Sequence, residues 1–193
     1  MRDPTADSWT RRGGIFAVAL SAPLVSCAPS PVVVAAPVAT AVVTIPPPGA
    51  LEAQILDFHN VERAQVGAAP LGWDPTLAAA AGRYATELAK LGTLRHSPAE
   101  DRPGQGENLW MGTRGAFTPA RMVGGWIGEK SMFRPGIFPD VSTNGAWQSV
   151  GHYTQMIWRG TTRLGCAIRS SARDDYLVCR YAPAGNVIGL PVP

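Results

Sequence analysis

The chain has 193 residues, with 17 Lys and Arg, 14 Asp and Glu, and a formal net charge of +3. An N-terminal leader and a Pro-rich stretch leave roughly 140 residues for folding, a common size for a single domain with one core. Without Arg2, Asp3, Asp7, Arg11 and Arg12 the charge falls to about +2, and no dense basic run remains. Nucleic acid is therefore excluded as an expected partner.

The first residues have the order of an export signal. Arg11 and Arg12 precede an apolar run over residues 13–25, about 13 residues long, which suits a signal peptide and is too short to span a bilayer. The run ends in Leu-Val-Ser-Cys, which resembles the bacterial lipobox, where cleavage occurs before a cysteine that carries lipid. We therefore expect a lipoprotein-type signal over residues 1–26 and lipidation of Cys27. The paired arginines also resemble a twin-arginine signal, so the export route stays open between the two pathways.

Residues 27–50 consist almost wholly of Pro, Ala, Val, Thr and Ser. This composition has too few bulky side chains for a core and enough proline to stay extended, so a tether is expected. More than one acyl chain at Cys27 would give stable membrane anchoring. The predicted location is thus the envelope of a bacterium, on its periplasmic or surface face, with secretion as the alternative.

Three amphipathic helices are expected next, over residues 51–66, 75–91 and about 118–133. Glycine directly after each of the first two supplies their ends. The second and third open with a capping side chain followed by proline, at Asp74-Pro75 and Thr118-Pro119. The residues on their inward faces are Leu51, Ile55, Phe58 and Glu62 in the first helix, Leu77, Ala80, Ala81, Tyr84, Leu88 and Leu91 in the second, and Met122, Trp126 and Glu129 in the third.

The C-terminal part is typical of an antiparallel hairpin, with strands over residues 164–170 and 176–181. If Cys166 lies opposite Cys179, the register closes through a short turn, and opposed residues come close enough for a disulfide. That bond would close a loop of about 14 residues and contribute on the order of 3 kcal/mol. An unbonded pair of small core residues is the alternative.

Three histidines occur, at positions 59, 96 and 152. Two histidines and two glutamates distributed along the chain are weak evidence for a metal site, because ligands must converge in space and a sequence shows only their order. No Ser/His/Asp order, nucleophilic cysteine motif or Gly-rich phosphate loop is recognisable. Any catalytic hypothesis therefore depends on the histidines and glutamates alone.

Two segments carry a family resemblance. Residues 151–161, GHYTQMIWRGT, and residues 176–187, YLVCRYAPAGNV, resemble the two signatures of the CAP superfamily of cysteine-rich secretory, antigen 5 and pathogenesis-related proteins. Upstream residues stand in the same order as in that family, so that the match spans about residues 51–187. They are His59-Asn60 with Arg63, Leu71-Gly72-Trp73, His96-Ser97, Gly106-Glu107-Asn108-Leu109, and Trp126 with Glu129.

The resemblance implies an α+β fold, a three-layer α-β-α sandwich over residues 51–190, with a central cleft. Two histidines and two acidic residues line that cleft in the family, and they carry over to His96, His152, Glu107 and Glu129. The imidazoles would bind a divalent ion, with zinc as the preferred metal, while the carboxylates of Glu107 and Glu129 orient the rings without binding the metal themselves. If the protein is a hydrolase, Glu107 or Glu129 would be its general base.

Three functions remain as hypotheses. The first is a binding module of the cell envelope whose partner is a lipid, glycan or peptide, with the membrane reached through the lipid anchor. The second is a metal-dependent, protease-like hydrolase that uses the same cavity, and the third is a purely structural envelope protein. An enzymatic role is not the preferred reading. His59 is expected to have a core or capping role.

The aromatic residues divide into two predicted groups. Trp73, Trp126 and Trp158 are expected in the core. Trp110, Phe133, Phe138 and Trp147 border the segments that should edge the cleft. For these four, packing at the core or rim is preferred over contact with an apolar ligand.

Overall fold

The computed structural model describes residues 48–193. The predicted export signal, the lipidation site Cys27 and all but the end of the predicted tether lie outside the described residues. Between residues 48 and 193, no helix is long and apolar enough to cross a membrane. In chain order the helices and strands are α1 (Pro48–Gln65), β1 (Gly72–Trp73), α2 (Pro75–Leu91), β2 (Gly106–Thr113), α3 (Pro119–Gly128), β3 (Gly136–Ile137), α4 (Gly151–Ile157), β4 (Arg163–Ser170), β5 (Asp174–Ala182) and β6 (Pro191–Val192), with short 3₁₀ helices at Ala99–Asp101, Glu129–Met132 and Trp147–Ser149.

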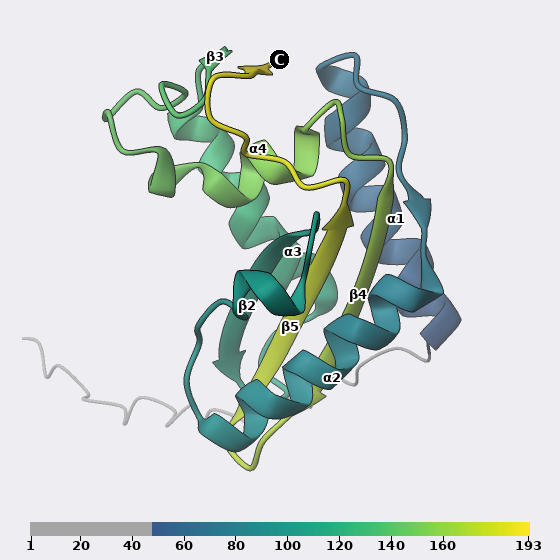
Figure 1. Ribbon diagram of the computed structural model, residues 1–193. Coiled ribbons are helices and arrows are strands. Elements are labelled where there is room, and N and C mark those ends of the chain that lie inside the picture. The colour runs from purple at the N-terminus through teal and green to yellow at the C-terminus, as the bar shows by residue number, and fades with distance from the viewer. Residues whose placement is uncertain (1–47) are drawn as a thin grey trace, which may run out of the picture. The chain divides into compact units, whose positions relative to one another are not determined.

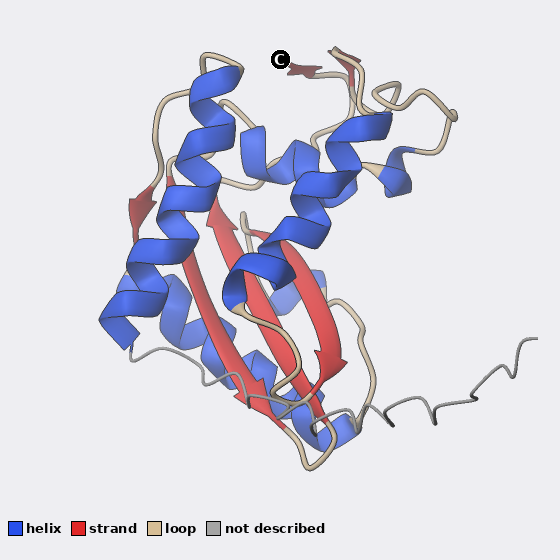
Figure 2. Cartoon of the chain, turned by 180° about the vertical axis from the view of Figure 1, so that it is seen from behind, coloured by secondary structure: helices blue, strands red, loops and turns tan. Residues whose placement is uncertain are grey.

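A four-stranded sheet in the order β1-β4-β5-β2 forms the middle layer. Strand β1 runs parallel to β4, and the other two pairings are antiparallel. Helix α2 covers one face of the sheet, and α1, α3 and α4 cover the other (Figures 1 and 2). The predicted three-layer α-β-α sandwich is therefore confirmed.

Each face of the sheet has its own core. On the α2 face, small and aromatic side chains of the helix pack against alternate residues of the strands. On the opposite face, apolar residues of α1, α3 and α4 pack against the remaining strand positions. The first core contains Ala81, Tyr84, Ala85, Leu88, Leu109, Ala167, Tyr176 and Val178, and the second includes Ile55, Met122, Val123, Trp126, Met156, Leu164, Leu177 and Tyr181.

Helix α2 has the ends that its sequence predicts. The Asp74 side chain accepts hydrogen bonds from the backbone N–H groups of Thr76 and Leu77, and Pro75 occupies the first helical position. Gly92 ends the helix with a positive φ of 68°, a conformation that suits glycine because it has no Cβ.

The other two predicted helices differ from the structure at their ends. Helix α1 begins at Pro48, three positions inside the segment expected to be tether, where the missing N–H of proline costs nothing. Helix α3 ends at Gly128, and the chain continues as a 3₁₀ turn over Glu129–Met132 rather than as α-helix to residue 133. Such a tightening is common in the last turn of a helix.

The C-terminal hairpin has the predicted register. Cys166 pairs with Cys179, Ile168 with Leu177, and Ser170 with Asp175. The two cysteines form a disulfide across the hairpin, with a Cα–Cα distance of 4.1 Å. Both sulfurs lie in the core on the α1, α3 and α4 face.

Candidate functional site

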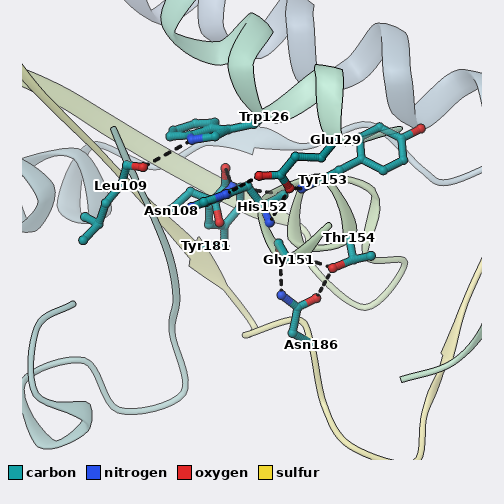
Figure 3. Close-up of polar contacts among 10 residues, drawn as sticks. All are labelled: Asn108, Leu109, Trp126, Glu129, Gly151, His152, Tyr153, Thr154, Tyr181 and Asn186. Atoms are coloured by element: carbon teal, nitrogen blue, oxygen red, sulfur yellow. Dashed lines mark hydrogen bonds and ion pairs between the residues drawn. The ribbon is translucent and has the colours of Figure 1, made fainter. Parts of the chain in front are cut away.

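His152 and Glu129 form the first of two histidine–glutamate pairs. The Nδ1 atom of His152 lies 2.6 Å from Oε1 of Glu129. The other oxygen, Oε2, accepts the backbone N–H groups of His152 at 3.0 Å and of Tyr153 at 3.1 Å, in the first turn of α4 (Figure 3). The carboxylate therefore fixes both the imidazole and the start of the helix that carries it.

The ring of His152 stacks on Trp126. The centroids are 5.8 Å apart and the planes are inclined by 15°. Trp126 is buried in α3 and donates its Nε1–H to the backbone carbonyl of Leu109 in β2 at 3.3 Å. The imidazole is thus held flat against a fixed surface, while the His152 side chain stays 33% exposed.

His96 and Glu107 form the second pair. Nδ1 of His96 lies 2.8 Å from Oε1 of Glu107, which also accepts the backbone N–H of Ser97 at 3.0 Å. Oε2 accepts the Ser97 hydroxyl at 3.1 Å and contacts Nη2 of Arg180 at 3.0 Å. The Glu107 carboxylate is fully buried, whereas the His96 side chain is 56% exposed.

The Glu107 carboxylate stays ionised despite its burial. Burial alone raises the pKa of this group, but the hydrogen bond from His96, the positive charge of Arg180 and the N–H of Ser97 together outweigh it, so that the pKa is lowered. Because an ionised carboxylate only accepts hydrogen bonds, Nδ1 of His96 carries the proton. A lone pair is then available on Nε2 whenever the ring carries a single proton.

Each of the two imidazoles has the contacts that a metal-binding histidine usually has. In both pairs Nδ1 faces a carboxylate, and no hydrogen bond engages Nε2 of His96 or His152 within residues 48–193. A carboxylate behind a histidine is the usual arrangement around zinc ligands. In the same range no group of three or more His, Cys, Asp or Glu side chains lies close enough to hold a metal ion, so solvent or a ligand would complete the coordination.

Asn108 and Asn186, for which the sequence predicted no role, also hold the segment around His152 in place. Asn108 donates its Nδ2–H to the backbone carbonyl of His152 at 3.1 Å. Asn186 has a positive φ of 54°, donates to the carbonyl of Gly151 at 2.8 Å, and accepts the hydroxyl of Thr154 at 2.7 Å. Both lie inside the motifs quoted above, but a motif alone does not say which backbone atoms a side chain reaches.

His59 lies apart from the two pairs, in the core. It is fully buried in α1, with Nδ1 at 2.7 Å from the carbonyl of Ile55 and Nε2 at 2.8 Å from the hydroxyl of Tyr181. Both ring nitrogens are therefore used inside the protein. This agrees with the expected core role.

The aromatic residues pack mostly as expected. Trp126 and Trp158 are buried and Trp73 is half-buried. Among the residues predicted to edge the cleft, Trp110 packs edge-on against Phe117, Phe133 packs against Tyr153, and Phe138 contacts both Trp147 and Trp158. Trp147 remains 38% exposed.

A surface cleft of about 350 Å³ lies elsewhere, at the N-terminus of α2. Its lining includes Asp74, Gln105 and Arg163 and none of the four histidine and glutamate residues. Asp74 and Arg163 form an ion pair at 2.8 Å, and Asp74 also caps α2. Asp74 and Arg163 are thus engaged in structure, whereas the side-chain oxygen of Gln105 is buried without a hydrogen-bond partner among the described residues.

Comparison with known proteins gives one consistent result. The family model described as CAP, cysteine-rich secretory protein family, matches residues 56–181. Pathogenesis-related protein 1C of Nicotiana tabacum is 42% identical over 135 residues, which cover 69% of this chain and 76% of that protein. The secreted protein RBT4 of Candida albicans is 34% identical over 139 residues, covering 70% of this chain and 36% of that protein. Among solved structures, the crystal structure of NaASP2 with Zn²⁺ has a TM-score of 0.62 and 27% identity, and the match covers 77% of this chain and 89% of that one.

Proposed function

This chain belongs to the cysteine-rich secretory protein (CAP) family. We propose that it is an exported binding module in which His96 and His152 hold a divalent metal ion, with zinc as the preferred metal. One observation carries the proposal. Each imidazole is fixed through Nδ1 by its own glutamate and leaves Nε2 without a protein partner among the described residues. When bound, the metal would act as a Lewis acid toward a ligand that enters from solvent.

The two glutamates act in this proposal as orienting groups. Glu107 and Glu129 each accept hydrogen bonds on both oxygens. The donors to Glu129 are the imidazole and two backbone N–H groups, and those to Glu107 are the imidazole, the N–H and hydroxyl of Ser97, and Arg180. Such a contact fixes the tautomer of the ring and increases the basicity of its free nitrogen. NaASP2, a structural relative, was crystallised with Zn²⁺, which supports the choice of metal.

The state of Glu107 favours binding over hydrolysis, and both oxygens of Glu129 are likewise occupied by hydrogen bonds. A general base needs a lone pair directed at a water molecule and a pKa near the working pH. Glu107 is fully buried, both of its oxygens are occupied, and its pKa is lowered. Binding is also favoured over a purely structural role, because both imidazoles remain partly exposed.

The proposed setting is the cell envelope. The relative RBT4 is named as a secreted protein, which supports export of this chain. Lipidation at Cys27 would keep the domain at a membrane surface, where its partner would be a lipid, glycan or peptide. Metabolic labelling with a fatty acid, compared between the wild type and Cys27→Ser, tests the anchor.

Metal content of the purified chain tests the site itself. The wild type should bind one Zn²⁺, and His96→Ala, His152→Ala and the double variant should each lose it, as measured by calorimetric titration and elemental analysis. His59→Gln is the matched control, because it removes a histidine that lies outside the site. A wild type without stoichiometric metal, or a double variant that retains it, would refute the proposal.

A further inference from the structure

Three polar atoms of His152 are held by side chains from other segments. Glu129 accepts from its backbone nitrogen and from Nδ1, at 3.0 and 2.6 Å. Asn108 donates to its backbone carbonyl oxygen at 3.1 Å (Figure 3). Within the described chain, Nε2 is the remaining polar atom of this residue, so its direction is determined by Glu129 and Asn108 together.

Asn108 is itself fixed in one orientation. Its side chain is buried, and Nδ2 donates a second hydrogen bond to the hydroxyl of Tyr181 at 3.1 Å. Only the amide nitrogen can donate to a carbonyl, so the contact with His152 sets which way the amide faces. The Tyr181 hydroxyl in turn donates to Nε2 of His59 at 2.8 Å, which connects the arrangement to α1.

Asn108 follows Glu107 directly in strand β2. Adjacent side chains of a strand point to opposite faces of the sheet. Glu107 lies on the α2 face, where it contacts Arg180, whose guanidinium stands over the ring of Tyr84 in α2. Asn108 points to the face covered by α4. Two consecutive residues therefore hold the two histidines, Glu107 through an imidazole and Asn108 through a backbone carbonyl.

We propose that Asn108 is a positioning residue of the two-histidine site and that the Glu107-Asn108 dipeptide sets the placement of His152 relative to His96. The inference rests on the proposed metal binding and adds a determinant of affinity that does not itself touch the metal. A residue that orients a ligand in this way typically changes metal affinity by 10- to 100-fold when it is replaced.

The test compares Asn108→Ala with Tyr181→Phe in the full chain. Asn108→Ala removes the donor to His152. Tyr181→Phe removes the other partner of Asn108 and leaves the His152 contact in place, so it controls for a general loss of stability. Two measurements are made on each protein: Co²⁺ affinity, from the visible absorption of the bound ion, and the ¹⁵N and ¹H signals of the His152 ring without metal.

We expect Asn108→Ala to weaken Co²⁺ binding at least tenfold and to shift the His152 ring signals, while Tyr181→Phe stays within about threefold of the wild type. Wild-type affinity and ring signals in Asn108→Ala would overturn the proposal. So would an equal loss in Tyr181→Phe, or an Asn108→Ala chain that does not fold, because either result means that Asn108 acts on the fold as a whole. If the wild type binds no Co²⁺, the metal proposal fails, and the His152 signals alone decide the role of Asn108.

Discussion

The three histidines of this chain differ in their burial and in how many of their ring nitrogens are hydrogen-bonded. His96 and His152 are partly exposed and each has one nitrogen without a protein partner in the described residues. His59 is fully buried and uses both nitrogens, as donor to Ile55 and as acceptor from Tyr181. Burial, and to a smaller extent the charge of Arg63, lower the pKa of His59 to about 4, although the bond to Ile55 opposes the shift. The ring is therefore neutral at physiological pH.

Stability should depend on pH through His59. The unfolded chain has a His pKa of about 6.5 and binds more protons than the folded chain between that value and about 4. The contribution of neutral His59 is thus fully present above pH 6.5 and is lost as the pH falls toward 4, by about 1.4 kcal/mol per pH unit. Urea unfolding at pH 7.5, 5.5 and 4.5 measures it.

The matched variant for this prediction is His59→Gln. It should be less stable than the wild type at pH 7.5, since it loses the paired contacts with Ile55 and Tyr181. The difference in unfolding free energy should shrink on acidification, because glutamine does not titrate. A constant difference across the three pH values would show that His59 is not the source of the pH dependence.

At the scale of elements, the close packing of α2 on β4 depends on Gly165. A Cβ at this position would lie 2.2 Å from the backbone nitrogen of Ala78 and 2.6 Å from the carbonyl oxygen of Asp74. Both atoms belong to the main chain at the start of α2, so a rotamer change cannot relieve the overlap. The helix would have to move away from the strand.

Gly165→Ala should therefore lower the free energy of unfolding by about 3 kcal/mol, at the upper end for overpacking. Gly124→Ala in α3 is the control, because a Cβ there meets no atom within 4 Å. That variant should raise stability by about 0.5–1 kcal/mol through helix propensity. Thermal unfolding of both variants measures the contrast, and equal effects would mean that the contact at Gly165 does not limit the approach of α2.

At the scale of the whole molecule, Arg63 connects α1 to the segment that follows α4. Its buried guanidinium donates to the carbonyls of Met156, Trp158, Thr161 and Ala69 at 2.6–2.9 Å. None of these partners is a carboxylate, and burial lowers the pKa of Arg63 to about 10. The side chain thus donates to four backbone carbonyls at once, of which that of Trp158 also accepts the backbone N–H of Thr161.

Arg63→Met should destabilise the fold by about 3–5 kcal/mol, since several buried carbonyls lose their donor at once. Arg159→Met is the control, because that exposed arginine reaches a single carbonyl, of Val66. It should cost less than about 1 kcal/mol. Denaturant unfolding at pH 7.5 distinguishes the two, and a loss below 1 kcal/mol in Arg63→Met would show that water replaces the guanidinium.

The sequence predicts those parts of the fold that depend on neighbouring residues, such as helix caps and hairpin register. The ends of α2 follow from Asp74, Pro75 and Gly92, and the register of the C-terminal hairpin follows from its two cysteines. Strand β2 was not predicted, because its residues GENLWMGT include two glycines and no β-branched run. The helical state of α4 was not predicted either, since its seven residues depend on Glu129, which is distant in the chain.

For the candidate site, the residue types were predictable and their pairing was not. The family resemblance gives His96, Glu107, Glu129 and His152 as one set. The structure pairs His96 with Glu107 of β2, and His152 with Glu129 of the 3₁₀ helix after α3. The contribution of Asn108 depends on which face of β2 it occupies, and this is a property of the assembled sheet.

Strand β2 also determines where the chain can tolerate insertions and deletions. Asn108 of β2 lies opposite Cys179 of β5, and Cys179 is bonded to Cys166 of β4. The neighbouring strands β4 and β5 are therefore covalently linked at the level of Asn108. A slip of β2 by a single residue against β5 would exchange the faces of Glu107 and Asn108 and release both histidines at once. The loop before β2 does not carry this constraint. Length variation compatible with the site should therefore accumulate there and be absent from the strand.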